Sequence, residues 1–524
     1  MKILTVKDDA QSFLGRYAAG EFDSYDYDLS QTDIYARRQQ LSPHAHTEQL
    51  GKVIENYMSD LELTAAQTRS LHDLKSGSQV VIGGQQAGLM ISPLYTIHKI
   101  ISIIVLAQEQ SKALGTTLVP VFWIAGEDHD FSEVNHAYLY DHANRKMQKF
   151  KVATKREAED SVSHFSLTAD EMTATITQFV SRLLETERTK EIYDKLTQLP
   201  LNWTSHFKAL VHELFKDYGL VMIDSADPAF RGLQRDKLLW MFDHHHEIDD
   251  AFHAGQKKMD SYSIETTTNV HLFMSEDGKR QLLNCAEGRY HLGKSAVSYS
   301  AEEIRALIAA EPERFSNNVV TRPLMEELMF NTLAFIGGPA EVRYWGELYE
   351  VFRLAEREMP IVMPRMRITY LDSRIRKLVE RYQLPLAEVV TEGLENQTDH
   401  FLKEDTNVLL ALELQQTTDQ LTGQYQKMIQ LAESEQVKRL IESNLAHHLK
   451  QVDYLRKAYN KQLHQRNKTM LQHFNEIEAY LHPREGLQER TWHPLVMLNN
   501  YSLTLFDDVI ESVEYTLEQQ ILEI

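Results

Sequence analysis

Two apolar runs, joined by one long helical segment, restrict the fold of this chain more than any other feature of its sequence. Residues 79–82 favour a β-strand, and residues 118–125 are apolar throughout, which is typical of a strand covered on both faces. The segment between them predicts a helix with Ser92 as its cap, Pro93 in its first turn and Gly115 at its end. A strand, a crossover helix and a second strand predict two parallel neighbours in one sheet.

The same alternation recurs further along the chain. Residues 206–218 predict a helix, 220–224 a strand and 225–242 a helix with Asp227 as cap and Pro228 at its first position. Later segments predict helices over 322–330 and 339–356, a buried strand over 332–338 and an extended stretch over 359–371. Repeated alternation predicts the α/β class, with a Rossmann-like, doubly wound and mostly parallel sheet.

Three regions of different composition indicate the domain organisation. We assign residues 1–383 to the Rossmann-like core, with a helical insertion near 150–201 and a small β-meander near 261–298. Residues 384–479 have almost no glycine or proline and predict a helical coiled-coil domain, and residues 480–524 are expected to return to the core. The spacing of apolar residues gives the predicted seam of the coiled coil: Leu431, Ile441, Leu445, Val452, Leu455 and Tyr459.

The charge and the cysteine content exclude several classes of function. The 524 residues have a formal net charge of -21, which disfavours broad binding to nucleic acid or to anionic membranes. The single cysteine, Cys285, allows no intramolecular disulfide and no CxxC metal site. No apolar run reaches the roughly 20 residues of a membrane span, and the first residues do not resemble a signal peptide. We therefore expect a cytoplasmic protein with small-molecule partners.

Polar loops follow both strands of the first strand–helix–strand unit. The first loop has the sequence GGQQAG, in which we predict substrate contacts by Gly84, Gln85, Gln86 and Gly88. We also expect the N-terminus of the following helix to bind an anion. A tight turn with glycines needed only for packing is the alternative. Loops at the carboxyl ends of neighbouring parallel strands converge where such folds bind ligands.

The second loop, GEDHDF, concentrates carboxylates around an imidazole. We predict catalytic roles for His129, Asp128 and Asp130, because carboxylates stabilise an imidazolium and can take part in proton transfer. A solvated acidic loop, a set of helix caps and a hard-cation site are the alternatives, and we predict no metal.

A third group of candidate residues lies within residues 315–348, and Arg365 follows at the end of a later strand. Arg322 could hold a carboxylate or phosphate through two hydrogen bonds, and Arg365 is either a second anion contact or one partner of a structural ion pair. The predicted substrate-binding residues here are Asn318, Arg322, Gly338, Glu341, Tyr344 and Arg365.

Other features of the sequence indicate no function. The tract DHHHE at 243–247 resembles a metal-binding tract, but consecutive residues of a helix point in different directions, so we interpret it as a solvated face. Cys285 has no catalytic sequence context. The loop GGQQAG does not match GxGxxG, and neither GGQQAG nor GEDHDF matches GxxxxGK[ST], so neither of these two loops has a nucleotide-binding fingerprint.

Five blocks in order, GGQQAGLMISPLYTIHK, PVFWIAGEDHDFSEVNH, NNVVTRPLMEE, AFIGGPAEVRYW and MPRMRITYL, resemble the bacillithiol biosynthesis cysteine-adding family, BshC. The resemblance extends over essentially the whole chain. It implies a Rossmann-like core, a coiled coil used for homodimerisation, and the last step of bacillithiol synthesis. In that step, cysteine is joined by an amide bond to the glucosamine amine of glucosaminyl malate.

The resemblance can be connected to the candidate residues. Arg322, Arg365 and the helix end after Gly88 would bind anionic groups, and His129 with Asp128 or Asp130 would take a proton from the attacking amine. Amide formation from a free carboxylate needs an energy source, so we consider ATP as a cosubstrate, although the sequence does not locate its site. Two alternatives stay open: a metal-dependent hydrolase or nucleotidyltransferase, and a non-catalytic dimeric nucleotide-binding scaffold.

Overall fold

The chain forms two compact units in the computed structural model, which describes residues 1–25, 33–41, 44–156, 161–293 and 297–524. The first unit comprises Met1–Leu139, Gln148–Leu371 and Gln488–Ile524. The second comprises Tyr140–Met147 and Asp372–Leu487. The C-terminal segment is therefore part of the first unit, although the helical region precedes it in sequence.

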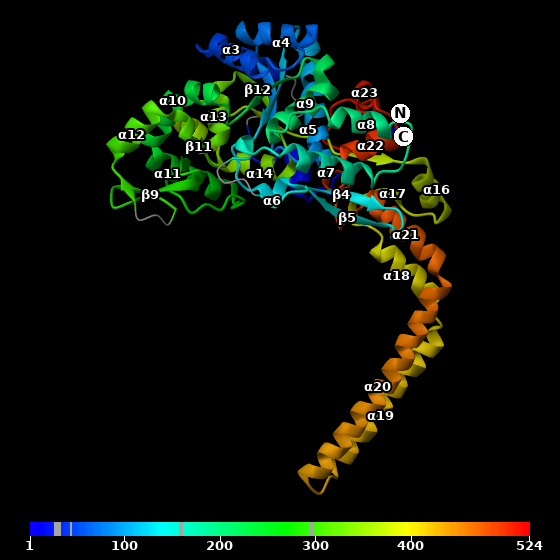
Figure 1. Cartoon of the computed structure of the whole chain (residues 1–524). Helices are drawn as coiled ribbons and strands as arrows, with labels where there is room; N and C mark the ends of the chain where they lie inside the picture. The colour runs from blue at the N-terminus through cyan, green and yellow to red at the C-terminus, as the bar shows by residue number, and fades with distance from the viewer. Residues whose placement is uncertain (26–32, 42–43, 157–160, 294–296) are drawn as a thin grey trace. The chain divides into compact units, whose positions relative to one another are not determined.

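A five-stranded parallel sheet forms the centre of the first unit (Figure 1). Its order is β13 (Ile361–Pro364), β12 (Thr332–Gly337), β2 (Val80–Gln85), β3 (Val119–Ile124) and β6 (Val221–Asp224). Each of these strands is buried along almost its whole length, as expected for a sheet covered on both faces. The predicted Rossmann-like fold is confirmed, including the parallel pairing of β2 with β3.

The crossover helix α5 (Leu94–Leu114) connects β2 to β3 and ends at Gly115, which has the predicted left-handed conformation. The predicted start of this helix is wrong. Pro93 is the cap, and a separate turn, η1 (Leu89–Ile91), precedes it. The first helical N–H, on Leu94, donates to the Trp492 carbonyl at 2.9 Å, so a distant segment replaces the predicted serine cap.

The later alternation also follows the prediction. Asp227 caps α10 (Pro228–Asp243) by accepting a hydrogen bond from the Phe230 N–H, and Pro228 occupies the first position. Helix α9 (Trp203–Phe215) leads into β6, and α13 (Arg322–Met329) and α14 (Pro339–Glu347) flank β12. The first unit also contains α1 (Phe13–Ala18), α2 (Asp33–Gln39), α3 (Thr47–Tyr57), α4 (Ala65–Lys75), α6 (Phe131–Val134), α11 (His245–Met259), α12 (Ala301–Ala310), α15 (Tyr349–Leu354), α22 (Pro494–Asn500) and α23 (Leu505–Ser512).

Both predicted insertions have the expected secondary structure. The first contains α7 (Ala169–Val180) and α8 (Thr189–Leu196). The second is an antiparallel meander of β7 (Leu272–Glu276), β8 (Lys279–Ala286), β9 (Arg289–Leu292) and β10 (Ser298–Tyr299). Its first two turns have positive φ at both central residues, Asp277-Gly278 and Glu287-Gly288. The sequence did not predict that β11 (Phe315–Asn317) joins this sheet beside β7.

The predicted extended stretch over 359–371 is divided between two sheets. Its first part is β13, whereas β14 (Ile368–Leu371) pairs with β15 (Gln519–Glu523), which also pairs with β1 (Lys2–Val6). Strands β4 (His136–Asp141) and β5 (Lys146–Lys151) form a separate two-stranded sheet.

The second unit is mainly helical and contains the predicted coiled coil. Helices α19 (Val408–Gln430) and α20 (Glu435–Arg466) run beside each other as a long hairpin (Figure 1). Ile441, Leu445, Val452 and Tyr459 are half-buried, whereas the predicted seam residues Leu431 and Leu455 are exposed. Leu431 ends α19 as its cap. The remaining helices are α16 (Ser373–Arg381), α17 (Leu386–Glu392), α18 (Glu395–Glu404) and α21 (Lys468–Leu481).

Candidate active site

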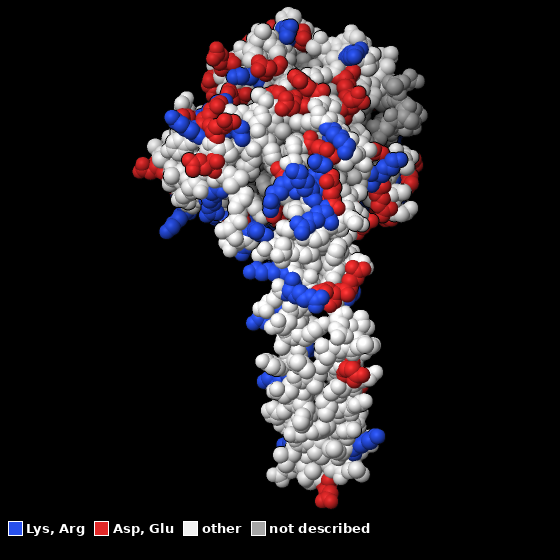
Figure 2. All heavy atoms as spheres, turned by 90° about the vertical axis from the view of Figure 1, so that its right-hand side faces the viewer, with Lys and Arg blue, Asp and Glu red and all other residues white. Residues whose placement is uncertain are grey.

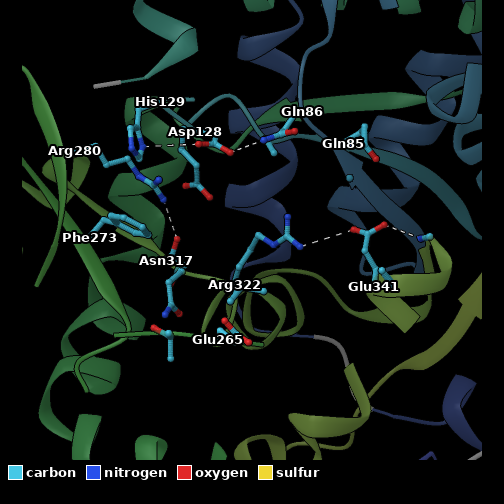
Figure 3. Close-up of a pocket in the computed structure, with 18 of the residues that line it drawn as sticks. Gln85, Gln86, Asp128, His129, Glu265, Phe273, Arg280, Asn317, Arg322 and Glu341 are labelled. Atoms are coloured by element: carbon cyan, nitrogen blue, oxygen red, sulfur yellow. Dashed lines mark hydrogen bonds and ion pairs between the residues drawn. The ribbon is translucent and has the colours of Figure 1, made fainter. Parts of the chain in front are cut away.

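A cavity of about 660 Å³ lies at the carboxyl ends of β2, β3, β12 and β13. This volume is in the range typical of small-molecule sites. Figure 3 shows Gln86, Asp128 and His129 along one edge, with Arg322 and Glu341 across from them. Most of the predicted residues line it: Gly84, Gln85, Gln86, Asp128, His129, Asn318, Arg322, Gly338, Glu341 and Arg365.

Glycine lets the first loop leave the sheet without a clash. A Cβ on Gly84 would lie 2.9 Å from the Trp123 carbonyl oxygen of the neighbouring strand β3. The loop then presents Gln86, whose Nε2 donates to Asp128 Oδ2 at 2.5 Å (Figure 3). The two polar loops predicted to converge therefore meet directly.

Asp128 and His129 form the polar edge of the cavity. Burial raises the pKa of the Asp128 carboxyl, but hydrogen bonds from Gln86 and from the Asp130 N–H hold this pKa below its ordinary value. His129 Nδ1 lies 3.8 Å from Asp128 Oδ1, and the imidazole is 44% exposed. The pair therefore combines a persistent carboxylate with an accessible proton acceptor.

Asp130 lies outside the cavity, contrary to its predicted catalytic role. Its carboxylate accepts hydrogen bonds from the Ser132 N–H at 3.1 Å and from the Ser132 hydroxyl at 2.6 Å. Asp130 is the cap of α6, which explains why an acidic residue stands at this position.

Arg322 and Glu341 belong to a charged cluster on the opposite wall. Lys99 Nζ donates to Glu341 Oε2 at 2.5 Å and to the Gly84 carbonyl at 2.6 Å. Arg322 Nη2 lies 3.9 Å from Glu341 Oε1 and donates to the Tyr344 hydroxyl at 2.6 Å. Burial raises the pKa of Glu341, but Lys99 and Arg322 hold this pKa below its ordinary value. Tyr344 supports Arg322 and is not among the lining residues, contrary to its predicted substrate contact.

Arg365 lines the cavity and also forms the buried ion pair that the sequence left as an alternative. Its Nη1 donates to Glu489 Oε1 at 2.6 Å, and Glu489 Oε2 lies 2.8 Å from His98 Nδ1. Burial raises the pKa of Glu489, but Arg365 and His98 bring it down to about 2. The next residue, Arg490, also lines the cavity.

Sequence reasoning missed Arg280 and Phe273, which the β-meander contributes. The Arg280 guanidinium lies 3.6 Å from the centroid of the Phe273 ring, and its Nε donates to Ser316 Oγ at 2.8 Å. Burial lowers the pKa of Arg280 to about 10, against the effect of Asp128. The meander resembled an independent insertion, and no local signal showed that one face of it closes the cavity. Other lining residues without a sequence signal are Tyr95, Glu265, Thr266, Thr267 and Arg490.

Gly88 has a packing role. A Cβ there would lie 1.9 Å from the Ser92 carbonyl oxygen, and Gly88 lines a separate small apolar cavity beside Trp203. Gly88 is not among the residues that line the active-site cavity, so the structure gives no support to the predicted substrate contact there. At the expected anion site, the Leu94 N–H at the start of α5 already donates to the Trp492 carbonyl.

The fold and the site together are those of a Rossmann-like enzyme with a cavity of small-molecule size. Arg280, Arg322, Arg365 and Arg490 can bind carboxylate or phosphate groups, and Asp128 with His129 can accept a proton in the same cavity. In the described parts of the chain, no helix has the length and apolar character needed to cross a membrane.

Comparison with known proteins identifies the family. Residues 2–366 match the N-terminal Rossmann-like domain of bacillithiol biosynthesis BshC, and residues 368–524 match its C-terminal coiled-coil domain. The chain belongs to the BshC family.

Three relatives with the name "Putative cysteine ligase BshC" show the extent of the similarity. The Staphylococcus carnosus protein is 40% identical over 508 residues, covering 95% of each chain. The Staphylococcus saprophyticus protein is 39% identical over 524 residues, covering 98% of this chain and 96% of its own. The Staphylococcus aureus MRSA252 protein is 40% identical over 508 residues, covering 95% of each chain. These relatives support the ligase interpretation over the hydrolase and scaffold alternatives.

Proposed function

We propose that this enzyme joins cysteine to glucosaminyl malate through an amide bond, as the last step of bacillithiol synthesis. The observation that carries the proposal is a single cavity with arginines on several walls and the Asp128–His129 pair on one edge. The acceptor has the matching groups, since malate supplies two carboxylates and glucosamine supplies the amine.

The arginines would bind and orient the carboxylates. Arg322 is the best candidate for binding a malate carboxylate. Its partner Glu341 is also paired with Lys99, so Glu341 neutralises the charge of Arg322 only in part. Arg280, Arg365 and Arg490 supply further donors for the second carboxylate and for the carboxyl group of cysteine. Binding at several fixed donors would place the amine in one orientation.

His129 would accept the proton that the amine loses on attack. The amine nitrogen forms a bond to the activated carbonyl carbon of cysteine, its proton passes to the imidazole, and the activating group leaves with the electrons of its bond to carbon. Asp128 would stabilise the resulting imidazolium, and Gln86 would hold Asp128 in position.

ATP is the cosubstrate that we propose for activating the cysteine carboxyl group. Amide formation from a carboxylate in water is unfavourable without such activation. The cavity offers arginine donors that suit phosphate oxygens. The pattern GxxxxGK[ST] occurs at residues 288–295, but this stretch contains strand β9 of the antiparallel meander and does not lead from a strand into a helix, as a phosphate loop does. A cytoplasmic location belongs to the same proposal, because a thiol substrate requires a reducing compartment.

A homodimer formed through the helical unit is also proposed. Exposed large apolar side chains concentrate on α19 and α20, among them Leu409, Leu412, Leu440 and Tyr454. The face of this hairpin visible in Figure 2 is mostly uncharged. Burying such a surface against a second copy would stabilise the association.

Deletion of the gene tests the proposed function in the cell. The proposal requires bacillithiol to disappear and glucosaminyl malate to accumulate, as measured by mass spectrometry of small thiols and their precursors. The wild-type gene should restore bacillithiol, whereas His129→Ala, Arg322→Ala and Gln86→Ala should not restore it fully. The exposed residue His72 provides a matched control, His72→Ala, which should restore it. Full restoration by all three site variants would reject the site.

A further inference from the structure

A cluster of potential metal ligands lies outside the cavity, where β8 approaches the start of α11. His245 and His246 begin α11, and Cys285 lies near the end of β8. One ligand atom from each residue lies within 4.8 Å of the other two. The interpretation of residues 243–247 as a solvated face is wrong for His245, which is only 3% exposed, whereas His246 is exposed.

Asn269 holds two of these three residues in place. Its carbonyl oxygen lies 3.0 Å from His245 Nδ1, which requires the proton on Nδ1 and leaves a lone pair on Nε2. Its side-chain Oδ1 accepts from the Cys285 N–H at 2.9 Å, and its Nδ2 donates to the Cys285 carbonyl at 3.0 Å. A carbonyl on the remote ring nitrogen is a common outer partner of a metal-binding histidine.

Tyr290 lies beside both His245 Nε2 and Cys285. Tyr290 pairs with Cys285 across β8 and β9, and its hydroxyl lies 3.0 Å from His245 Nε2. A cation bound between His245 Nε2 and the Cys285 thiol would replace the hydrogen bond between His245 and Tyr290. The exposed His246 lies beside them, since its ring centroid is 3.9 Å from that of His245.

We propose that His245, His246 and Cys285 bind a zinc ion, with water as the fourth ligand. Imidazole nitrogen and thiolate sulfur are the ligands that zinc prefers in proteins, and three protein ligands with one water is a common arrangement. Binding forms a zinc–sulfur bond and releases the thiol proton of Cys285.

The zinc site is distinct from the active-site cavity but shares a strand with it. Cys285 and Arg280 both lie on β8, separated by roughly 16 Å at the rise of an extended strand. The ion would connect α11 to the strand that carries Arg280, and it would fix the meander against the helix.

Cobalt provides the probe, because Co²⁺ binds zinc sites and absorbs light when a thiolate coordinates it. Full-length protein freed of metal by a chelator should bind one Co²⁺ per chain with a thiolate-to-cobalt charge-transfer band. Zn²⁺ should displace the cobalt and remove the band. The chain has one cysteine, so this band reports on Cys285 alone.

Variants at the partly exposed ligands complete the test. Cys285→Ser should abolish the band, and His246→Ala should weaken Co²⁺ binding at least tenfold; Asn269→Ala should weaken it on the order of 10- to 100-fold. His244→Ala is the matched control, because the His244 ring lies beside the Trp240 carbonyl, outside the cluster. Zn²⁺ should raise the melting temperature of wild type and of His244→Ala, but not that of Cys285→Ser. A wild-type protein without the band, or equal Zn²⁺ affinity in Cys285→Ser, would overturn the proposal.

Discussion

Three consecutive acidic and basic residues, Asp128, His129 and Asp130, have different roles although they share one loop. Asp128 accepts from Gln86 and faces the cavity, and His129 lies beside Phe273 of the meander. Asp130 is turned toward Ser132 as a helix cap. Residue type alone could not separate these roles, because each side chain suits either proton transfer or capping.

Removing the imidazole should affect chemistry more than binding. In His129→Ala, kcat should fall roughly 100-fold or more, which is the usual contribution of a general base, with a smaller change in KM. Asp130→Asn keeps an oxygen for the cap and should retain most of the activity. Steady-state rates of amide formation measure both variants. Equal losses in the two variants would contradict the different roles.

Glu326 should make the stability of the enzyme depend on pH. Burial raises the pKa of Glu326 to about 8, against the effect of Arg322, and its Oε1 has no hydrogen-bond partner among the residues that the structure describes. Because the folded state binds the proton more tightly than the unfolded state, this contribution to stability is full at low pH and is lost as the pH rises toward 8. Glu326→Gln should lessen the loss of stability between about pH 6 and about pH 8, as measured by urea unfolding. An unchanged pH dependence would show that Glu326 is ionised throughout.

At the scale of elements, the short segment η5 (Gln488–Arg490) completes the cavity from the far end of the sequence. Gln488 forms two hydrogen bonds with the backbone of Tyr370, at 2.8 Å and 3.0 Å. Glu489 joins Arg365 to His98, and Arg490 reaches the cavity. The segment therefore positions one arginine through an ion pair and contributes another.

Breaking this ion pair should both loosen the site and destabilise the fold. Glu489→Gln leaves the Arg365 guanidinium buried without its counter-ion, so the free energy of unfolding should fall by about 3–5 kcal/mol. The KM for glucosaminyl malate should rise because Arg365 loses its fixed orientation. Glu523→Gln removes the partner of the more exposed Lys2 and should cost less than about 1 kcal/mol. Similar stabilities of the two variants would contradict the importance of the buried pair.

Sequence analysis predicted correctly those elements whose signals lie in their own residues. Periodicity and glycine predicted β2, β3 and the loops after them, because both signals are local. Lys99 of the crossover helix contacts the lining residues Gly84 and Glu341, and Arg280 of an inserted strand lines the cavity itself, and both positions depend on tertiary packing. The residues next to Lys99 and Arg280 in the sequence do not indicate where these side chains lie in the folded protein. For the same reason, sequence analysis could not predict that the Trp492 carbonyl, and not Ser92, accepts from the first N–H of α5.

At the scale of the whole molecule, the helical unit has more exposed apolar surface than its own hairpin can bury. Leu409 is 75% exposed and Leu440 is 68% exposed. Periodicity predicted a long helical pair, but not which apolar residues would face the neighbouring helix, because several registers fit the same spacing. A second copy of the chain is the partner that we propose for the exposed residues.

Charges on this surface should prevent dimerisation. The double variant Leu409→Glu with Leu440→Glu should sediment as a monomer, whereas wild type should sediment as a dimer, because burying four carboxylates per dimer interface is costly. Leu201→Glu changes an exposed leucine of the first unit and should leave the dimer intact. A dimeric double variant would place the interface elsewhere.

A crystal structure with glucosaminyl malate bound tests the central claim most directly. We expect the malate carboxylates to contact arginines of the cavity, Arg322 among them, and the glucosamine nitrogen to lie near His129, within about 4 Å or linked through one water molecule. A ligand bound outside this cavity, or one whose amine points away from the Asp128–His129 edge, would contradict the account.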